Sequence, residues 1–137
     1  MSRLSFWGQK GQIYSEEAFR HMLAIERKRA SRSNRSLLLL LVRFKGASGR
    51  RVEIPPAVSA ALFSGLALCV REIDVVGWHR EGRIAGAVLA QGHSVLNSHA
   101  VPRIIERVTD VLRRRLSTNE TKNLEVRVIS LGRGQST

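Results

Sequence analysis

Residues 71–90 constrain the fold more than any other stretch, because their pattern predicts a β-hairpin. Residues 73–78 form an apolar run rich in β-branched side chains, and residues 83–90 form a second apolar run. Between these runs, Arg80-Glu81-Gly82 supplies a turn in which the glycine can adopt a positive φ. Two adjacent antiparallel strands are therefore expected, and the other segments must be arranged around them.

Three segments outside the hairpin are predicted to be helices. Ser15 can cap the first, whose first turn also carries two glutamates. Two prolines open the second, and apolar residues at helical spacing indicate the third. These helices are expected over residues 15–34, 55–70 and 99–116.

Two further segments are predicted to be strands. Residues 37–44 begin with five leucines, and so short an apolar run favours a strand buried on both faces. In residues 124–131 apolar and polar side chains alternate, which is typical of a half-buried strand. Residues 117–123 are expected to form a polar loop.

The predicted core order is strand, helix, strand, strand, helix, strand, with one more helix in front. This is the ferredoxin-like order, an α+β fold with an antiparallel sheet that is also the core of cyclase and polymerase palms. Right-handed crossovers would place both core helices on one face. The 137 residues are expected to form one domain over residues 14–132, with an N-terminal arm over residues 1–13 and a tail over residues 133–137.

The net charge of +12 points toward an anionic partner. Lysine and arginine total 23 against 11 acidic residues, and 19 of the 23 are arginine, whose planar group suits phosphate. The alternative is that most of the excess is solvated helix surface.

The chain is expected to come from a reducing compartment and to have no membrane span. Its single cysteine, Cys69, lies in an apolar run and is expected to be a buried small side chain, which fits a reducing compartment. The longest strictly apolar run, residues 37–42, is too short to cross a membrane. Residues 1–11 lack the apolar core of a signal peptide.

Metal-dependent catalysis is not expected. Palm-type active sites need carboxylates at the end of the first strand and at the central hairpin. The first predicted strand offers none, and the hairpin turn offers only Glu81, which is expected to pair with its neighbours Arg80 and Arg83. The four histidines show no metal-ligand spacing, and no serine has triad partners. No metal site and no cofactor is predicted.

Three stretches resemble the GGDEF domains of diguanylate cyclases. YSEEAFRHML, from Tyr14, resembles the family's opening LTGLxNRRxFxxxL, and LLLLLVRFK, from Leu37, resembles LLxLDIDxFKxxND. REIDVVGWHREGRIAGAVL, from Arg71, resembles RxxDxxxRxGGDEFxxLL. The resemblance extends over residues 14–132. It places Arg80, Glu81, Gly82, Arg83 and Ile84 on the signature Gly-Gly-Asp-Glu-Phe.

The resemblance implies a degenerate domain, because the groups with which the family handles GTP are replaced. The metal-binding aspartates of the first strand fall on Leu40 and Val42, and the catalytic glutamate falls on Arg83. The guanine-recognising asparagine and aspartate fall on Ser48 and Gly49. We therefore expect no cyclase activity.

One family site is retained in this comparison. Arg71 and Asp74 form an Arg-x-x-Asp motif five residues before the degenerate signature, at the position of the family's inhibitory site, so the resemblance implies that they bind cyclic di-GMP. Arg71 could clamp a phosphate, and Asp74 could accept hydrogen bonds from guanine. The family adds an arginine from the helix after the hairpin, for which Arg103 is the candidate. The alternative is a local salt bridge between Arg71 and Asp74.

Three functions follow from these patterns. The first is a catalytically inactive regulatory domain that binds cyclic di-GMP in the bacterial cytoplasm, as the resemblance implies. The second is a protein-interaction or dimerisation module that needs no nucleotide, with Trp7 or Trp78 as anchors. Nucleic-acid binding ranks third, because Phe44 is the only aromatic residue of the outer strands on which a base could stack.

Overall fold

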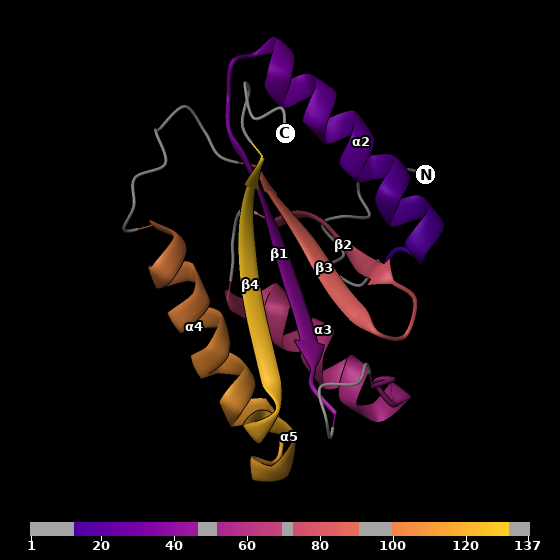
Figure 1. Ribbon diagram of the computed structural model, residues 1–137, viewed down its shortest axis with the longest axis vertical. Coiled ribbons are helices and arrows are strands. Elements are labelled where there is room, and N and C mark those ends of the chain that lie inside the picture. The colour runs from indigo at the N-terminus through magenta and orange to yellow at the C-terminus, as the bar shows by residue number, and fades with distance from the viewer. Residues whose placement is uncertain (1–12, 47–51, 70–72, 91–99, 132–137) are drawn as a thin grey trace.

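A four-stranded antiparallel sheet forms the centre of the computed structural model, which describes residues 13–46, 52–69, 73–90 and 100–131. The strand order is β2-β3-β1-β4, and every neighbouring pair is antiparallel. This is the predicted ferredoxin-like topology, with helices on both faces of the sheet (Figure 1). The strands are β1 (Leu37–Phe44), β2 (Ile73–Arg80), β3 (Ile84–Ala90) and β4 (Leu124–Leu131).

Strand β1 is buried on both faces, as its leucine run predicts. Successive side chains point to opposite faces of a strand. Leu38 and Leu40 enter the hydrophobic core on one face, whereas Leu37 and Leu39 enter a second core on the other face. All four are at most 5% exposed. A strand of this kind needs cover on both sides, which explains the three-layer arrangement.

Two helices, α3 (Pro56–Cys69) and α4 (Ala100–Arg115), cover the first face. Leu62 and Leu66 of α3 and Leu112 of α4 are fully buried in its core. The helices come close together at Gly65, where an added Cβ would lie 2.8 Å from Leu112 Cδ2. Both core helices therefore lie on one face, as expected.

Helix α2 (Glu16–Arg32) covers part of the second face, mainly over β2. Ser15 caps it as predicted, since its hydroxyl accepts a hydrogen bond from the Ala18 N–H. Phe19 is fully buried and lies against Gly86 of β3, where an added Cβ would be 2.8 Å from the ring. Just before the helix, Tyr14 forms a parallel bridge with the outer edge of β2 through two backbone hydrogen bonds of 3.0 Å.

The expected loop over residues 117–123 is wrong, because the short helix α5 (Thr118–Lys122) occupies it. The Ser117 hydroxyl accepts a hydrogen bond from the Glu120 N–H at 3.1 Å, and the Glu120 carboxylate accepts one from the Ser117 N–H at 2.9 Å. This reciprocal pair is a capping box, which stabilises a helix start despite the polar composition.

Among the described residues, no helix is both long and apolar enough to cross a membrane.

Replacing Leu40 by alanine should lower the free energy of unfolding by about 2–5 kcal/mol, because a fully buried side chain leaves a cavity. The matched variant Leu41→Ala should cost less than half as much, since Leu41 is only partly buried. Urea unfolding of both variants measures the difference. Equal losses would contradict the assignment of faces on β1.

Candidate functional site

The hairpin turn between β2 and β3 lies where the GGDEF signature was predicted to fall. Arg80 ends β2, and Ile84 begins β3 one residue later than expected. Gly82 has a φ of 71°, as the sequence predicts for this turn. The turn is closed by a hydrogen bond of 2.9 Å from the Arg83 N–H to the Arg80 carbonyl.

Helix α2 holds this turn through two reciprocal hydrogen bonds. The Glu16 N–H donates to Glu81 Oε1 at 3.0 Å, and the Glu81 N–H donates to Glu16 Oε1 at 2.8 Å. Each carboxylate therefore satisfies a backbone donor of the other segment, 65 residues away. We call this pair the Glu16–Glu81 clasp. It joins the first turn of α2 to the tip of the central hairpin.

Two arginines approach the clasp from either side of Glu16. Arg20 Nε lies 3.5 Å from Glu16 Oε2, and Arg80 Nη1 lies 3.7 Å from the same atom. The hydrogen bond from the Glu81 N–H holds the pKa of Glu16 below its ordinary value, and Arg20 and Arg80 act in the same direction. The expected pairing of Glu81 with its neighbouring arginines is wrong, because Arg80 approaches Glu16 and Glu81 accepts a backbone hydrogen bond.

His79 lies beside the clasp in an apolar setting. Its ring meets Phe19 edge-on, with the ring centroids 6.3 Å apart, and its Nδ1 has no hydrogen-bond partner among the described residues. Burial lowers the pKa of His79, and the nearby Arg20 and Arg80 lower it further, while Glu16 opposes them. Both effects favour the neutral imidazole, whose ring packs against Phe19.

The three positions on which the resemblance places the metal-binding and catalytic carboxylates carry no carboxylate here. Leu40 and Val42 are fully buried core residues, and Arg83 is exposed in the turn. Across the described parts of the chain, no three histidine, cysteine or acidic side chains are grouped so that they could hold a metal ion. The groups around the hairpin turn are instead arginine side chains and the hydrogen-bonded carboxylates of the clasp.

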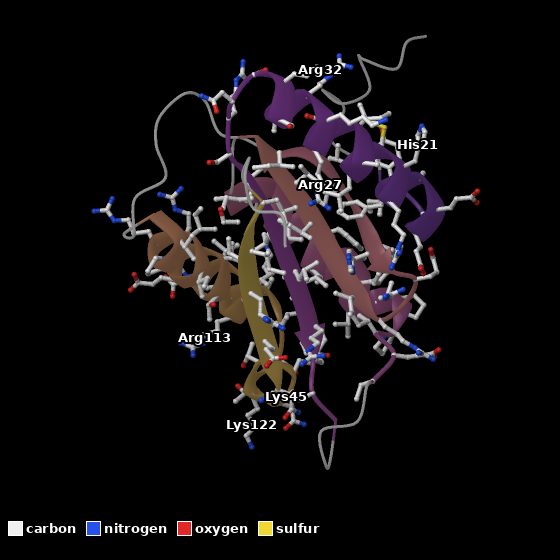
Figure 2. The ribbon with its side chains drawn as sticks, turned by 45° about the horizontal axis from the view of Figure 1, so that its top comes forward. His21, Arg27, Arg32, Lys45, Arg113 and Lys122 are labelled. Carbon is white, nitrogen blue, oxygen red and sulfur yellow. The ribbon has the colours of Figure 1, made fainter. Side chains whose placement is uncertain are left out.

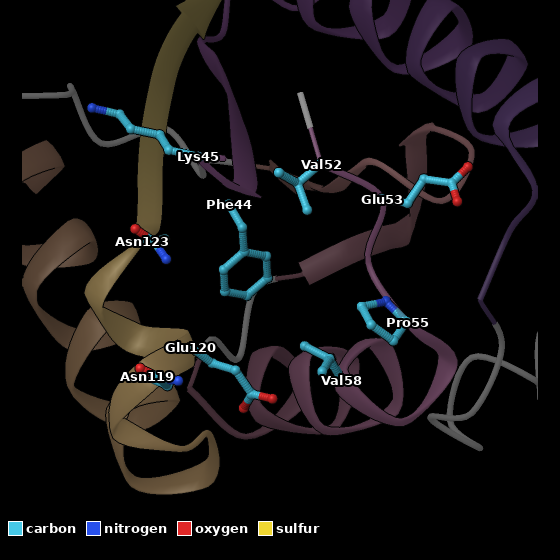
Figure 3. A pocket seen from close by; sticks show the side chains of 9 residues that line it. All are labelled: Phe44, Lys45, Val52, Glu53, Pro55, Val58, Asn119, Glu120 and Asn123. Atoms are coloured by element: carbon cyan, nitrogen blue, oxygen red, sulfur yellow. The ribbon is translucent and has the colours of Figure 1, made fainter. Parts of the chain in front are cut away.

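A cavity of about 220 Å³ opens at the same end of the sheet, beyond the C-terminal end of β1 (Figure 3). The Ile54 N–H donates to the Gly82 carbonyl at 2.7 Å, which ties the segment before α3 to the turn. Sequence reasoning missed this cavity, because α5 builds one wall and was expected to be a loop. Its lining combines apolar and polar side chains: Phe44, Lys45, Val52, Glu53, Pro55, Val58, Asn119, Glu120 and Asn123.

Of the predicted cyclic di-GMP residues, the structure describes the backbone of Asp74 and the whole of Arg103. Arg71 and the side chain of Asp74 lie outside the described residues, as do Ser48, Gly49, Trp7 and the side chain of Cys69. The backbone of Asp74 falls at a register irregularity of β2, between Ile73 and Val75. Arg103 is exposed in the first turn of α4. The structure thus places Arg103 and leaves the grouping of the three side chains as a prediction.

Trp78 lies at the margin of the core and is only partly buried. Its ring packs edge-on against Phe63 of α3, with the centroids 5.1 Å apart, and lies against the core cluster beneath α3 and α4. Its role as an interface anchor stays a prediction.

Comparison with known proteins supports the fold. No family model and no curated protein matches the chain. Among solved structures, the chain is similar to the FimX GGDEF domain from Pseudomonas aeruginosa, with a TM-score of 0.62 and 12% sequence identity. The match covers 93% of this chain and 81% of that chain. The chain therefore has a GGDEF-like fold.

Replacing Glu16 by glutamine should flatten the acid side of the stability–pH curve. The folded-state pKa of Glu16 lies below its ordinary value of 4.5, so its ionised carboxylate stabilises the fold above that pH. This contribution is lost as the pH falls through the lower folded-state pKa. The wild type should therefore lose more unfolding free energy than Glu16→Gln between pH about 5 and about 3.

Urea unfolding at several pH values measures this difference. Glu17→Gln is the matched control, because Glu17 is an exposed residue of the same helical turn and the charge change is identical. It should keep the wild-type slope. The same slope for Glu16→Gln and the wild type would contradict a role for the clasp.

Proposed function

We propose that this GGDEF-like domain is a regulatory module without cyclase activity, and that it binds cyclic di-GMP through Arg71, Asp74 and Arg103. The Glu16–Glu81 clasp is the observation that carries the proposal. In the clasp, the carboxylate of Glu81, the one carboxylate of the hairpin turn, accepts a hydrogen bond from the backbone of α2. This turn is at the position where a cyclase would handle GTP.

Loss of catalysis is expected from the chemistry around the clasp. Two-metal phosphoryl transfer requires carboxylates that clamp divalent cations near the triphosphate. The guanidinium groups of Arg20 and Arg80 lie within 3.7 Å of Glu16, so a cation placed there would meet positive charge. Leu40 and Val42 offer the metal no ligand atoms.

Binding of cyclic di-GMP is supported by location and charge. β2 begins opposite Leu89, near the end of β3, so Asp74 is separated from the clasp by most of the length of the strand. A ligand there would leave the clasp intact. Arg71 lies in the connection between α3 and β2, and Arg103 in the first turn of α4, so a bound dinucleotide would link three elements. Arginine binds phosphate in a bidentate manner that lysine cannot match.

Isothermal titration with cyclic di-GMP tests the binding proposal. The wild type should bind, and Arg71→Ala should weaken binding about tenfold or more, because one charge-assisted hydrogen bond is worth about 1.5–3 kcal/mol. Arg113→Ala, an exposed arginine in the last turn of the same helix as Arg103, should leave the affinity unchanged. No heat with the wild type, or equal heats for wild type and Arg71→Ala, would reject the ligand.

Incubation with GTP and Mg²⁺ tests the expected inactivity separately. Chromatography of the nucleotides should show no cyclic di-GMP above the level of a protein-free control. Product that accumulates in proportion to protein, and that disappears in a Glu81→Gln variant, would overturn this part of the proposal without affecting the binding test.

A further inference from the structure

The two faces of the sheet are covered unequally. Helices α3 and α4 share one face, whereas α2 is the only described helix on the other (Figure 1). Because α2 packs mainly on β2, the described residues cover the half formed by β1 and β4 less fully. Leu41, Ile129 and Leu131 point to this half and are only partly buried. We call it the open half-face.

Basic side chains surround the open half-face. Arg127 is exposed on β4 and faces it directly opposite Leu41, and Arg27 projects from α2 over the sheet (Figure 2). Arg43 also faces it but is paired with Glu125, and this pairing holds the pKa of Glu125 below its ordinary value. Among the described residues, neither Arg27 nor Arg127 forms an ion pair. Their charges can therefore meet an anionic partner.

The charge of this chain disfavours its own segments as the cover. Residues 1–12 and 132–137 contain three basic residues and no acidic one. A second copy would bring another net charge of +12 against the first. A partner complementary to these charges would be acidic and would come from another molecule.

The shape and composition of the open half-face favour a peptide over a membrane or nucleic acid. Helix α2 rises about 10 Å above the strands, the diameter of a helix, so a flat bilayer resting on it would not reach Leu41 or Ile129. Single-stranded nucleic acid is held by aromatic side chains that stack on bases. Phe44, the aromatic residue of β1, is 8% exposed and belongs to the core on the opposite face.

We propose that the open half-face binds an acidic amphipathic helix of a partner protein. This helix would lie beside α2 and run along β1 and β4. Its apolar stripe would cover Leu41, Ile129 and Leu131, and its acidic residues would meet Arg27 and Arg127. The strands are eight residues long, or about 26 Å. A helix of about 17 residues has the same length. This partner site includes neither the residues of the clasp nor those proposed to bind the nucleotide.

A designed peptide of about 18 residues is the probe, with leucines at helical spacing on one stripe and glutamates elsewhere. Fluorescence anisotropy should show binding to the full chain with a Kd of about 10–100 µM. The double variant Arg27→Glu/Arg127→Glu should weaken it about tenfold. Arg113→Glu/Lys122→Glu is the matched control, because it changes the net charge equally on exposed residues of α4 and α5 and should leave the Kd within about twofold.

A peptide of the same composition with its leucines and glutamates shuffled separates stripe recognition from bulk charge. The proposal is overturned if the shuffled peptide binds equally, if both double variants weaken binding equally, or if the striped peptide does not bind. It is also overturned if anionic vesicles or a single-stranded oligonucleotide bind through Arg27 and Arg127 while the peptide does not. Those results would point to a membrane or a nucleic acid.

Amide chemical shifts supply a readout that does not depend on charge-reversed variants folding. Addition of the striped peptide to the wild type should shift resonances of β1, β4 and α2, and should leave those of α3 unchanged. Shifts confined to α3 and α4 would overturn the placement of the partner. The milder variant Arg27→Gln/Arg127→Gln should weaken binding about threefold, which checks the contribution of charge in a chain with less perturbation.

Discussion

The need to bury β1 on both faces determines the rest of the structure. A strand whose first six side chains are all leucine or valine cannot leave either face in water, so the sheet requires helices on both sides. The two crossover helices meet this need on one face. On the other face it falls to α2, which lies outside the repeated strand–helix–strand pattern, and Phe19 and Ala30 of α2 share a core with Leu37 and Leu39.

The way α2 is attached has consequences at the hairpin. Because α2 lies over β2, its first turn comes close to the hairpin turn between β2 and β3. The first turn of the helix and the hairpin turn each have a backbone N–H group that needs a partner from outside its own element. Two carboxylates satisfy those donors, and the arginines beside them balance the charge. The groups that attach α2 to the sheet thus lie at the hairpin turn on which the resemblance places the GGDEF signature.

Local patterns were sufficient to predict the four strands, the three longer helices and the topology. The leucine run, the Ser15 cap and the glycine of the turn each act within a few residues, so the sequence states them directly. Helix α5 was also locally encoded, in Ser117 and Glu120, but its polar composition obscured it. The partner of Glu81 lies 65 residues away, and the packing of Trp78 depends on Phe63, so neither could be predicted from neighbouring residues. The site of Arg71 and Asp74 rests on a motif, and that is why it stays a prediction.

The two outer edges of the sheet differ in their backbone pairing, because Tyr14 pairs with one of them. Its bridge saturates part of the outer rim of β2, whereas no described segment pairs with the outer rim of β4. A strand that adds to the sheet at β2 would have to displace Tyr14 from Val76 and Trp78, whereas along β4 it would meet no described segment.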